Sequence, residues 1–315
     1  MKKLFMIIPL VLLLCFTFSC QQLVEEMAET TKEEVQTSGY INVDGIELPY
    51  FIEGTGIPCV IAADSGLQKK VLSQELRKEL KFIFLKSRND ISHESQDVFD
   101  KFTLDTFVDD IEQLRMALGF ERICVLGHSI VGIIAIEYAR KYPEHTSHVI
   151  MIGTPPGWNS GISKKGDEYW ETHASEERKM ILKRNQEQLE KEDLNSLSPL
   201  DAQRKWLMAS RPKYFYDPGI DYSLLFDYYW NVEGWNHFLN VIMDNYDITH
   251  GKQITTPIFL ALGLHDYIVP YVLWNDVKDT FPNLSYYLFE ISGHFPMHEE
   301  QELFDKKLID WVKSH

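Results

Sequence analysis

A short apolar strand that passes at once through a glycine and a serine into an apolar helix is the feature that most constrains this fold. Ile123–Leu126 is apolar, Gly127-His128-Ser129 follows, and a second apolar run continues to about Tyr142. A serine at such a tight turn stands above the sheet, beside the backbone N–H groups at the start of the helix. The arrangement is typical of a nucleophile placed next to half of an oxyanion hole.

This turn departs at one position from the usual G-x-S-x-G pattern. Val131 stands where the pattern has its last glycine, and Gly132 follows one position later. The turn brings helix and strand close together, so a side chain at that position is expected to be crowded. Gly132, one position later, should relieve part of this crowding. We therefore expect the turn to form, with altered packing around Val131.

Apolar strands alternate with helical segments on both sides of the turn. Asp44-Gly45 between two alternating runs predicts an initial hairpin. The alternation that follows predicts an α/β fold with a mostly parallel sheet, covered by helices on both faces. Strands are expected at residues 58–63, 81–86, 123–126, 147–152, 256–262 and 285–290, and helices at about 68–80, 103–118, 132–142, 272–281 and 299–313.

A long insertion interrupts the alternation after Pro156. It contains five of the seven tryptophans and long charged helical segments such as residues 176–192. We predict a core of residues 38–156 and 253–315, and a helical insertion at 157–252 that covers the carboxyl edge of the sheet as a lid. The alternative for its aromatic residues is that they form the core of the insertion itself.

The N-terminal residues 1–19 predict a signal peptide. Lys2 and Lys3 precede an unbroken apolar run, Leu4–Phe18, which is short for a membrane span and suited to a secretory signal. Cys20 follows a small residue at the end of this run, and the segment resembles the lipobox of bacterial lipoproteins. That resemblance implies export to the cell envelope and a lipid on Cys20 that anchors the chain to a bacterial membrane. Ordinary cleavage and an uncleaved anchor are the alternatives.

Residues 20–37 are polar and acidic and show no apolar periodicity over most of their length. Such a composition suits a tether between a membrane anchor and a folded body. A short amphipathic helix is the alternative interpretation. The tether ends where the first strand of the core is expected.

Charge and cysteine content exclude some classes of protein. The chain has 31 basic and 47 acidic residues without a block of lysines or arginines, which argues against a nucleic-acid partner. Cys59 and Cys124 fall inside apolar strands. A disulfide between neighbouring parallel strands would be strained, so we expect two buried free thiols.

Two later segments offer the partners that a serine nucleophile needs. Asp266 follows one apolar strand directly, and His294 stands in the loop after the next strand. A base beside the serine and an acid that orients the base would activate the hydroxyl. Both loops should reach the sheet edge where Ser129 lies, and the chain order is that of the Ser…Asp…His triad on a sheet of this type.

With these motifs in place, the chain resembles the α/β-hydrolase superfamily, in the lid-bearing branch that includes prolyl aminopeptidases. The resemblance rests on the segments at residues 102–119, 127–129, 263–266 and 292–296 and covers everything except the tether and lid. It implies that Ser129 is the nucleophile, His294 the general base and Asp266 its orienting acid. No cofactor is implied.

The second half of the oxyanion hole lies in the most altered loop. Relatives carry His-Gly, often His-Gly-Gly-Pro-Gly, after the strand that corresponds to residues 58–63, whereas this chain has Ala63-Asp64-Ser65-Gly66. The resemblance assigns the two backbone N–H donors to Ser65 and Ile130. An ionised Asp64 could repel the developing oxyanion or bind a substrate ammonium group.

The sequence therefore predicts a serine hydrolase that cleaves an ester or amide of a small molecule or short peptide through an acyl-enzyme. Two alternatives remain: a prolyl aminopeptidase, and a catalytically inactive α/β-hydrolase that acts as an envelope binding protein. A zinc site at His294 and His298 is not expected, because Pro296 between them is unsuited to a helix and no H-E-x-x-H motif occurs. No metal is predicted.

Overall fold

The computed structural model describes residues 37–64, 66–91 and 96–315. The predicted signal peptide, the predicted lipid-attachment residue Cys20 and nearly all of the predicted tether lie outside these residues, as does Ser65. Within the described ranges, no helix is both long enough and apolar enough to cross a membrane.

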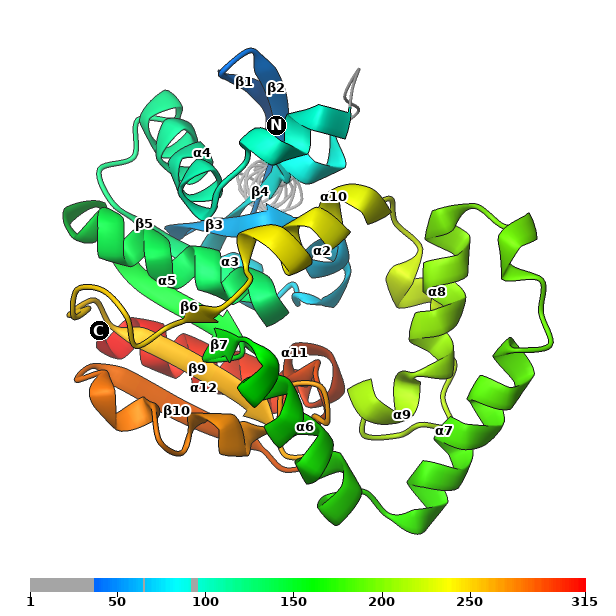
Figure 1. The fold of residues 1–315 in the computed structure, drawn as a ribbon. Coiled ribbons are helices and arrows are strands. Elements are labelled where there is room, and N and C mark those ends of the chain that lie inside the picture. Colours follow the sequence, from blue (N-terminus) through cyan, green and yellow to red (C-terminus); the bar gives the residue numbers. More distant parts are fainter. Residues whose placement is uncertain (1–36, 65, 92–95) are drawn as a thin grey trace, which may run out of the picture. The chain divides into compact units, whose positions relative to one another are not determined.

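The described part of the core is built on a sheet of eight strands, in the order β1-β2-β4-β3-β5-β6-β9-β10 (Figure 1). β2 and β4 are antiparallel, and the successive neighbours from β4 to β10 are parallel. The predicted mostly parallel sheet is confirmed. Its strands are β1 (Thr37–Val43), β2 (Ile46–Glu53), β3 (Ile57–Asp64), β4 (Leu80–Lys86), β5 (Ile123–His128), β6 (Thr146–Ile152), β9 (Ile258–Gly263) and β10 (Leu284–Phe289).

The expected hairpin joins β1 and β2. Asp44 and Gly45 form its two-residue turn and both have a positive φ, 53° and 82°. Asparagine, aspartate and glycine tolerate this left-handed conformation, and two such residues in succession match the twist of the flanking strands. The local sequence thus fixes where the sheet begins.

Helices cover both faces of the sheet. On one face, α4 (Leu104–Ala117) and α5 (Gly132–Lys141) pack over the central strands. On the other face lie α2 (Leu67–Val71), α3 (Leu76–Glu79) and α12 (Gln301–Ser314), which contribute to a second apolar cluster. This double covering accounts for the nearly continuous apolar sequence of the central strands.

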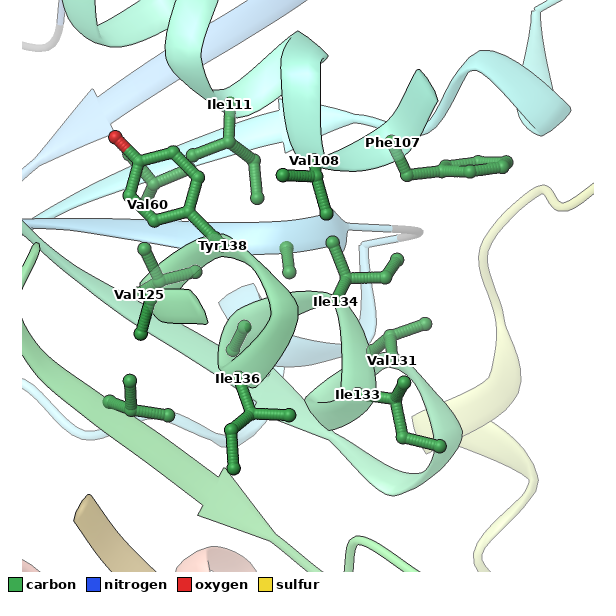
Figure 2. Close-up of a cluster of buried hydrophobic side chains, with 14 of the residues drawn as sticks. Val60, Phe107, Val108, Ile111, Val125, Val131, Ile133, Ile134, Ile136 and Tyr138 are labelled. Atoms are coloured by element: carbon green, nitrogen blue, oxygen red, sulfur yellow. The ribbon is translucent and has the colours of Figure 1, made fainter. Parts of the chain in front are cut away.

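Figure 2 shows the cluster between α4, α5 and the sheet. Ile134 and Tyr138 of α5 are buried against Val108 and Ile111 of α4, and Val60 of β3 belongs to the same cluster. Complete burial of one such aliphatic side chain stabilises the fold by about 1.5–3 kcal/mol. The helix that begins at the serine turn is therefore anchored firmly to the core.

Two cysteines face each other across β3 and β5. Cys59 and Cys124 are paired in register, their Sγ atoms are 3.4 Å apart, and both thiols are free, as expected from the sequence. Burial raises the pKa of the Cys59 thiol well above its usual value. These residues therefore behave as small apolar core residues.

A helical segment lies between β6 and β9. Its main helices are capped by the side chains of Asn159, Ser175, Ser198 and Asn231, each of which accepts backbone N–H groups of the first turn. A two-stranded ladder of β7 (Gly157–Trp158) and β8 (Tyr246–Asp247) joins the start of this segment to its end. The helices are α6 (Ser160–His173), α7 (Glu176–Leu189), α8 (Pro199–Ala209), α9 (Arg211–Tyr214) and α10 (Val232–His237) (Figure 1).

The prediction of a continuous helix at residues 68–80 is wrong, because this segment forms two separate helices, α2 and α3. The Ser73 hydroxyl accepts the N–H of Leu76 and so caps the second helix. The Arg77 guanidinium donates to the carbonyls of Leu72 and Ser73. Side chains thus satisfy the backbone groups that a continuous helix would have paired.

The helix expected at residues 272–281 is also absent, since the segment forms two short 3-10 turns, Tyr271–Trp274 and Lys278–Thr280. Asparagine and aspartate between these turns are weak helix formers. One buried side chain holds the segment to the core: the Trp274 indole donates to the Thr154 carbonyl at 2.8 Å. The last predicted helix, at residues 299–313, corresponds to α12, and the short helix α11 (Pro296–Glu299) precedes it.

Candidate active site

Ser129 follows β5 directly, where the strand passes through a 3-10 turn into α5. Its φ of 59° is unfavourable for a residue with a side chain and is typical of functional turns. Ser129 borders a cavity of about 270 Å³ that Ile130 and His294 also line. The strained turn thus presents the serine to a space that suits a small substrate.

The crowded position of this turn is residue 132 rather than residue 131. A Cβ atom on Gly132 would lie 1.9 Å from the Thr154 hydroxyl oxygen, and one on Gly127 would lie 2.5 Å from the Gly132 Cα. Val131 instead turns its buried side chain into the core cluster of α4 and α5 (Figure 2). Gly132 therefore provides the close approach that the usual pattern assigns to the preceding position.

His294 and Asp266 form a buried hydrogen-bonded pair. Nδ1 of His294 lies 2.6 Å from Oδ2 of Asp266, and neither side chain is exposed by more than 3 %. Oδ1 of Asp266 accepts the N–H groups of Ile268 and Val269 at 2.9 and 2.8 Å. These bonds fix the carboxylate, which in turn holds the imidazole so that its Nε2 atom is left for another partner.

The backbone of His294 is held from two sides. Its N–H donates to the Tyr214 carbonyl at 2.6 Å, and its carbonyl accepts from Nε2 of His128 at 2.9 Å. Burial lowers the pKa of His128 to about 3, so this ring is neutral and carries its proton on Nε2. The residue that precedes the serine therefore positions the loop of the histidine.

Gly153 makes room for the His294 ring. It has a φ of 55°, and a Cβ atom there would lie 3.0 Å from Nδ1 and Cε1 of the imidazole. Its N–H donates to the carbonyl of Ala261 in the neighbouring strand β9 at 2.8 Å. A larger residue at position 153 would displace either the ring or the backbone.

The structure describes one of the two predicted oxyanion donors, Ile130, and not the other, Ser65. Ile130 is the first residue after Ser129 and lines the cavity. Ser65 lies outside the described residues. Ala63, two residues before Ser65, lines the cavity and has a positive φ of 47°, so the backbone of β3 is strained at this residue.

Asp64 is buried but is not one of the residues that line the cavity. Its carboxylate accepts the N–H of Gly66 at 3.1 Å. Burial raises the pKa of Asp64 to about 6, against the opposing influence of Lys86. A contact between Asp64 and a substrate ammonium group therefore has no support from this geometry.

The described lining of the cavity is aromatic, aliphatic and amide in character, and contains no aspartate, glutamate, lysine or arginine. Gln68 of α2 and Gln203 of α8 are its two amides. The helical segment between β6 and β9 contributes aromatic side chains that include Tyr214, Phe226, Tyr228, Trp230 and Trp235. Some aromatics of this segment thus line the cavity, while others, such as Tyr169 and Trp170, belong to a separate apolar cluster.

Sequence reasoning did not identify Glu299, which links the lid to the histidine loop. Its carboxylate accepts the N–H groups of Tyr216 at 2.6 Å, Gly293 at 2.8 Å and Phe295 at 3.4 Å. Burial raises the pKa of Glu299 to about 7. Its position five residues after His294 is the only signal in the sequence, because its partners are backbone groups and one of them, the N–H of Tyr216, belongs to a distant segment.

Lys70 of α2 also links the α/β core to the helical segment between β6 and β9. The Lys70 ammonium donates to the carbonyls of Leu224 and Asp227, at 2.8 and 2.7 Å. Within the lid, the buried Arg178 guanidinium donates to the carbonyls of Pro212 and Phe215, both at 2.7 Å. The segment that contacts His294 is thus fixed to α7.

Comparison with known proteins agrees with this architecture. The sequence profile described as alpha/beta hydrolase fold matches residues 84–301. The AB hydrolase superfamily protein YclE of Bacillus subtilis is 28% identical over 288 residues, which cover 88% of this chain and 99% of that protein. A proline iminopeptidase of Clostridium botulinum is 25% identical over 69% of this chain and 74% of its own length.

Solved structures share the fold. An esterase from Exiguobacterium antarcticum superposes with a TM-score of 0.65 at 17% identity, over 88% of this chain and all of that one. At this identity the likeness concerns the fold alone. Together with the profile that matches more than half of the sequence, the topology shows that the chain belongs to the α/β-hydrolase family.

Proposed function

We propose that this chain is a serine hydrolase that cleaves an ester or amide bond of a small substrate through an acyl-enzyme. The observation that carries the proposal is the hydrogen bond between His294 and the buried Asp266, together with the cavity that both His294 and Ser129 line. The strained backbone of Ser129 supports the same conclusion.

In the proposed reaction, Oγ of Ser129 attacks the substrate carbonyl while Nε2 of His294 takes the hydroxyl proton. The tetrahedral intermediate collapses as the imidazolium returns that proton to the leaving alcohol or amine. A water molecule then attacks the acyl-enzyme, with His294 again as base, and releases the acid. Asp266 keeps the imidazole in the required tautomer throughout.

Two backbone donors would stabilise the oxyanion. Ile130, at the start of the turn that leads into α5, is the first, and Ser65 is the second by resemblance to the family. A backbone N–H does not depend on the side chain, so the altered Ala63–Gly66 loop can still supply it. Loss of one such donor costs about 10²–10³ in kcat.

The cavity favours a neutral ester over the N-terminal residue of a peptide. A substrate ammonium group buried without an acidic partner would be strongly disfavoured, and the described lining contains no carboxylate. The second candidate, a prolyl aminopeptidase, is motivated by the names of relatives such as the enzyme of Clostridium botulinum. An aminopeptidase of this kind would need a carboxylate partner for the substrate ammonium group. Glu168 and Glu171 of the predicted lid are exposed and already paired with lysines.

A substrate panel separates these candidates. Purified chain is assayed with p-nitrophenyl acetate, butyrate and hexanoate, and with the p-nitroanilides of proline and alanine. The proposal predicts turnover of the esters and kcat/KM values for the anilides at least about 100-fold lower. Faster turnover of prolyl p-nitroanilide would establish the aminopeptidase, and turnover of no substrate would favour the inactive binding protein.

We also propose that the chain is exported and anchored to a bacterial membrane by a lipid on Cys20, as the lipobox resemblance of its N-terminus implies. The test is fractionation of cells that express the full chain or Cys20→Ala. The proposal predicts a membrane-bound wild type and loss of the variant from the membrane fraction. Equal attachment of both would contradict lipidation at Cys20.

A further inference from the structure

The wall of the active-site cavity carries an accessible polar group without a partner, on Gln203. This residue is half-buried and lines the cavity together with Ser129 and His294. Its side-chain NH₂ group has no hydrogen-bond partner among the described residues, and it is not one of their inaccessible polar atoms. The group is therefore open to a ligand.

The orientation of this amide follows from the partner of its oxygen. Nε1 of Trp230 donates to Oε1 of Gln203 at 2.8 Å. An indole N–H is a donor only, so the atom that it meets must be the carbonyl oxygen, and the NH₂ group must lie on the other side of the amide. The group that Gln203 leaves for a ligand is thus a hydrogen-bond donor.

One face of α8 presents Gln203 to the cavity. Gln203 and Leu207 are four residues apart, which places them on the same side of the helix, and both line this cavity. Arg204 and Met208, the next residue in each case, line a separate hollow of the surface. The side chain of Gln203 therefore extends toward the space that Ser129 and His294 border.

Contacts around Trp230 hold this donor in place. Trp230 is only 6 % exposed and lines the same cavity. The Arg204 guanidinium donates to the carbonyls of Phe226 and Tyr228, and its Cζ atom lies 5.5 Å from the centre of the Trp230 ring. These bonds join α8 to the segment that carries Trp230. The amide therefore loses little freedom when a ligand binds to it.

The rest of the lining determines which acceptor suits this donor. The described lining contains no lysine or arginine, so a substrate carboxylate would be buried there without either of these cations. A neutral oxygen, such as the carbonyl of a ketone, an amide or a second ester, is satisfied by a single neutral donor. A neutral carbonyl oxygen is therefore the matching group.

We propose that Gln203 is a specificity-determining residue whose NH₂ group donates a hydrogen bond to a neutral carbonyl oxygen of the substrate, outside the bond that is cleaved. The preferred substrates are then esters that carry a second carbonyl group. This inference rests on the proposed serine hydrolase function. A site built around a hydrogen bond rejects analogues that lack the matching group far more strongly than a purely apolar site does.

The test compares keto esters with plain esters of the same chain length. Acid release is measured for methyl 5-oxohexanoate against methyl hexanoate, and for 5-oxohexyl acetate against hexyl acetate. The ketone thus lies in the acyl part of one pair and in the alcohol part of the other. Each ratio of kcat/KM is divided by the ratio of the alkaline hydrolysis rates, which removes differences in reactivity. The wild type should prefer the keto member of at least one pair by about tenfold or more.

Two variants separate substrate binding from a structural role of Gln203. In Gln203→Glu the carboxylate can still accept the indole N–H of Trp230, but at about pH 8 it is ionised and has no donor. Gln203→Met removes both groups. The preference should fall to about one or below in each variant. If Gln203 served only to hold Trp230, Gln203→Glu would keep the preference.

The control is Gln186→Glu, which makes the same change of charge at an exposed glutamine of α7. It should keep the preference of the wild type. Labelling of Ser129 by a fluorophosphonate shows that each variant is folded and reactive. If one variant of Gln203 fails to react, the other decides the outcome.

The outcomes distinguish this inference from the function on which it rests. A wild type that is labelled and hydrolyses the plain esters but prefers the keto member of neither pair would overturn the role of Gln203 alone. The same conclusion follows if a reactive variant of Gln203 keeps the full preference. A wild type that is neither labelled nor active would overturn both the hydrolase function and this inference.

Discussion

Nδ1 of His294 lies 2.6 Å from Oδ2 of Asp266, and both side chains are buried in the loops that follow β10 and β9. The other carboxylate oxygen is occupied by two backbone N–H groups. The pair is thus built to hold one orientation and one tautomer of the imidazole. Its consequences can be measured residue by residue.

Asp266→Asn should reduce kcat by about 10³–10⁴ with little change in KM. The asparagine oxygen can keep the two backbone bonds, so its NH₂ group would face Nδ1 of His294. The imidazole would then carry its proton on Nε2 and could not accept one from Ser129. Steady-state kinetics with a p-nitrophenyl ester measures the loss; a decrease below tenfold would contradict the assigned role.

Gly132→Ala should destabilise the fold by about 1–3 kcal/mol, because its Cβ would meet the Thr154 hydroxyl at 1.9 Å. Urea unfolding measures the free energy. The control is Gly166→Ala in α6, where an added Cβ has no neighbour within 4 Å. That change should be neutral or stabilise by about 0.4–1 kcal/mol. Equal effects at both positions would show that Gly132 does not make the close approach.

Asp64→Asn should flatten the pH dependence of stability between about pH 4 and 6. The folded chain raises the pKa of Asp64 from 3.8 to about 6, so the unfolded chain loses this proton first and stability falls as pH rises through that window. Above pH 6 the variant should gain about 3 kcal/mol relative to the wild type, at about 1.4 kcal/mol for each pKa unit.

Urea unfolding at a series of pH values gives the difference, and the exposed Asp279→Asn is the control. If the free energies of unfolding of Asp64→Asn and the wild type differ by a constant amount from pH 4 to 7, burial does not raise the pKa of Asp64. The expected difference in the free energy of unfolding instead grows from pH 4 upward and becomes constant above pH 6.

Glu299→Gln should lower kcat by roughly tenfold and reduce stability by about 1–3 kcal/mol. Glutamine has one acceptor oxygen and an NH₂ group, so at least one of the N–H groups of Gly293 and Tyr216 would face another donor. Kinetics and urea unfolding are compared with Glu302→Gln, an exposed residue of α12. If kcat is unchanged while stability falls, Glu299 supports the fold and does not position His294.

The sequence predicts the core because its signals are local. Ser129, Asp266 and His294 each follow an apolar strand, and parallel strands bring their carboxyl ends to one edge of a sheet. The structure accordingly brings Asp266 and His294 into one hydrogen bond, and Ser129 and His294 to one cavity.

The residues that sequence reasoning missed depend on distant partners. The carboxylate of Glu299 accepts the N–H of Tyr216, which lies 83 residues away in the sequence. The break between α2 and α3 likewise depends on Arg77, whose guanidinium takes carbonyls that a helix would have used. Periodicity in the sequence carries no trace of such contacts.

The central claim is that Ser129 is an activated nucleophile, and covalent labelling tests it most directly. Wild type and Ser129→Ala are treated with a fluorophosphonate probe at neutral pH, and the modified peptide is identified by mass spectrometry. The account predicts one label per chain on Ser129 and none on the variant. A wild type that does not react, or a variant that is labelled equally, would contradict it.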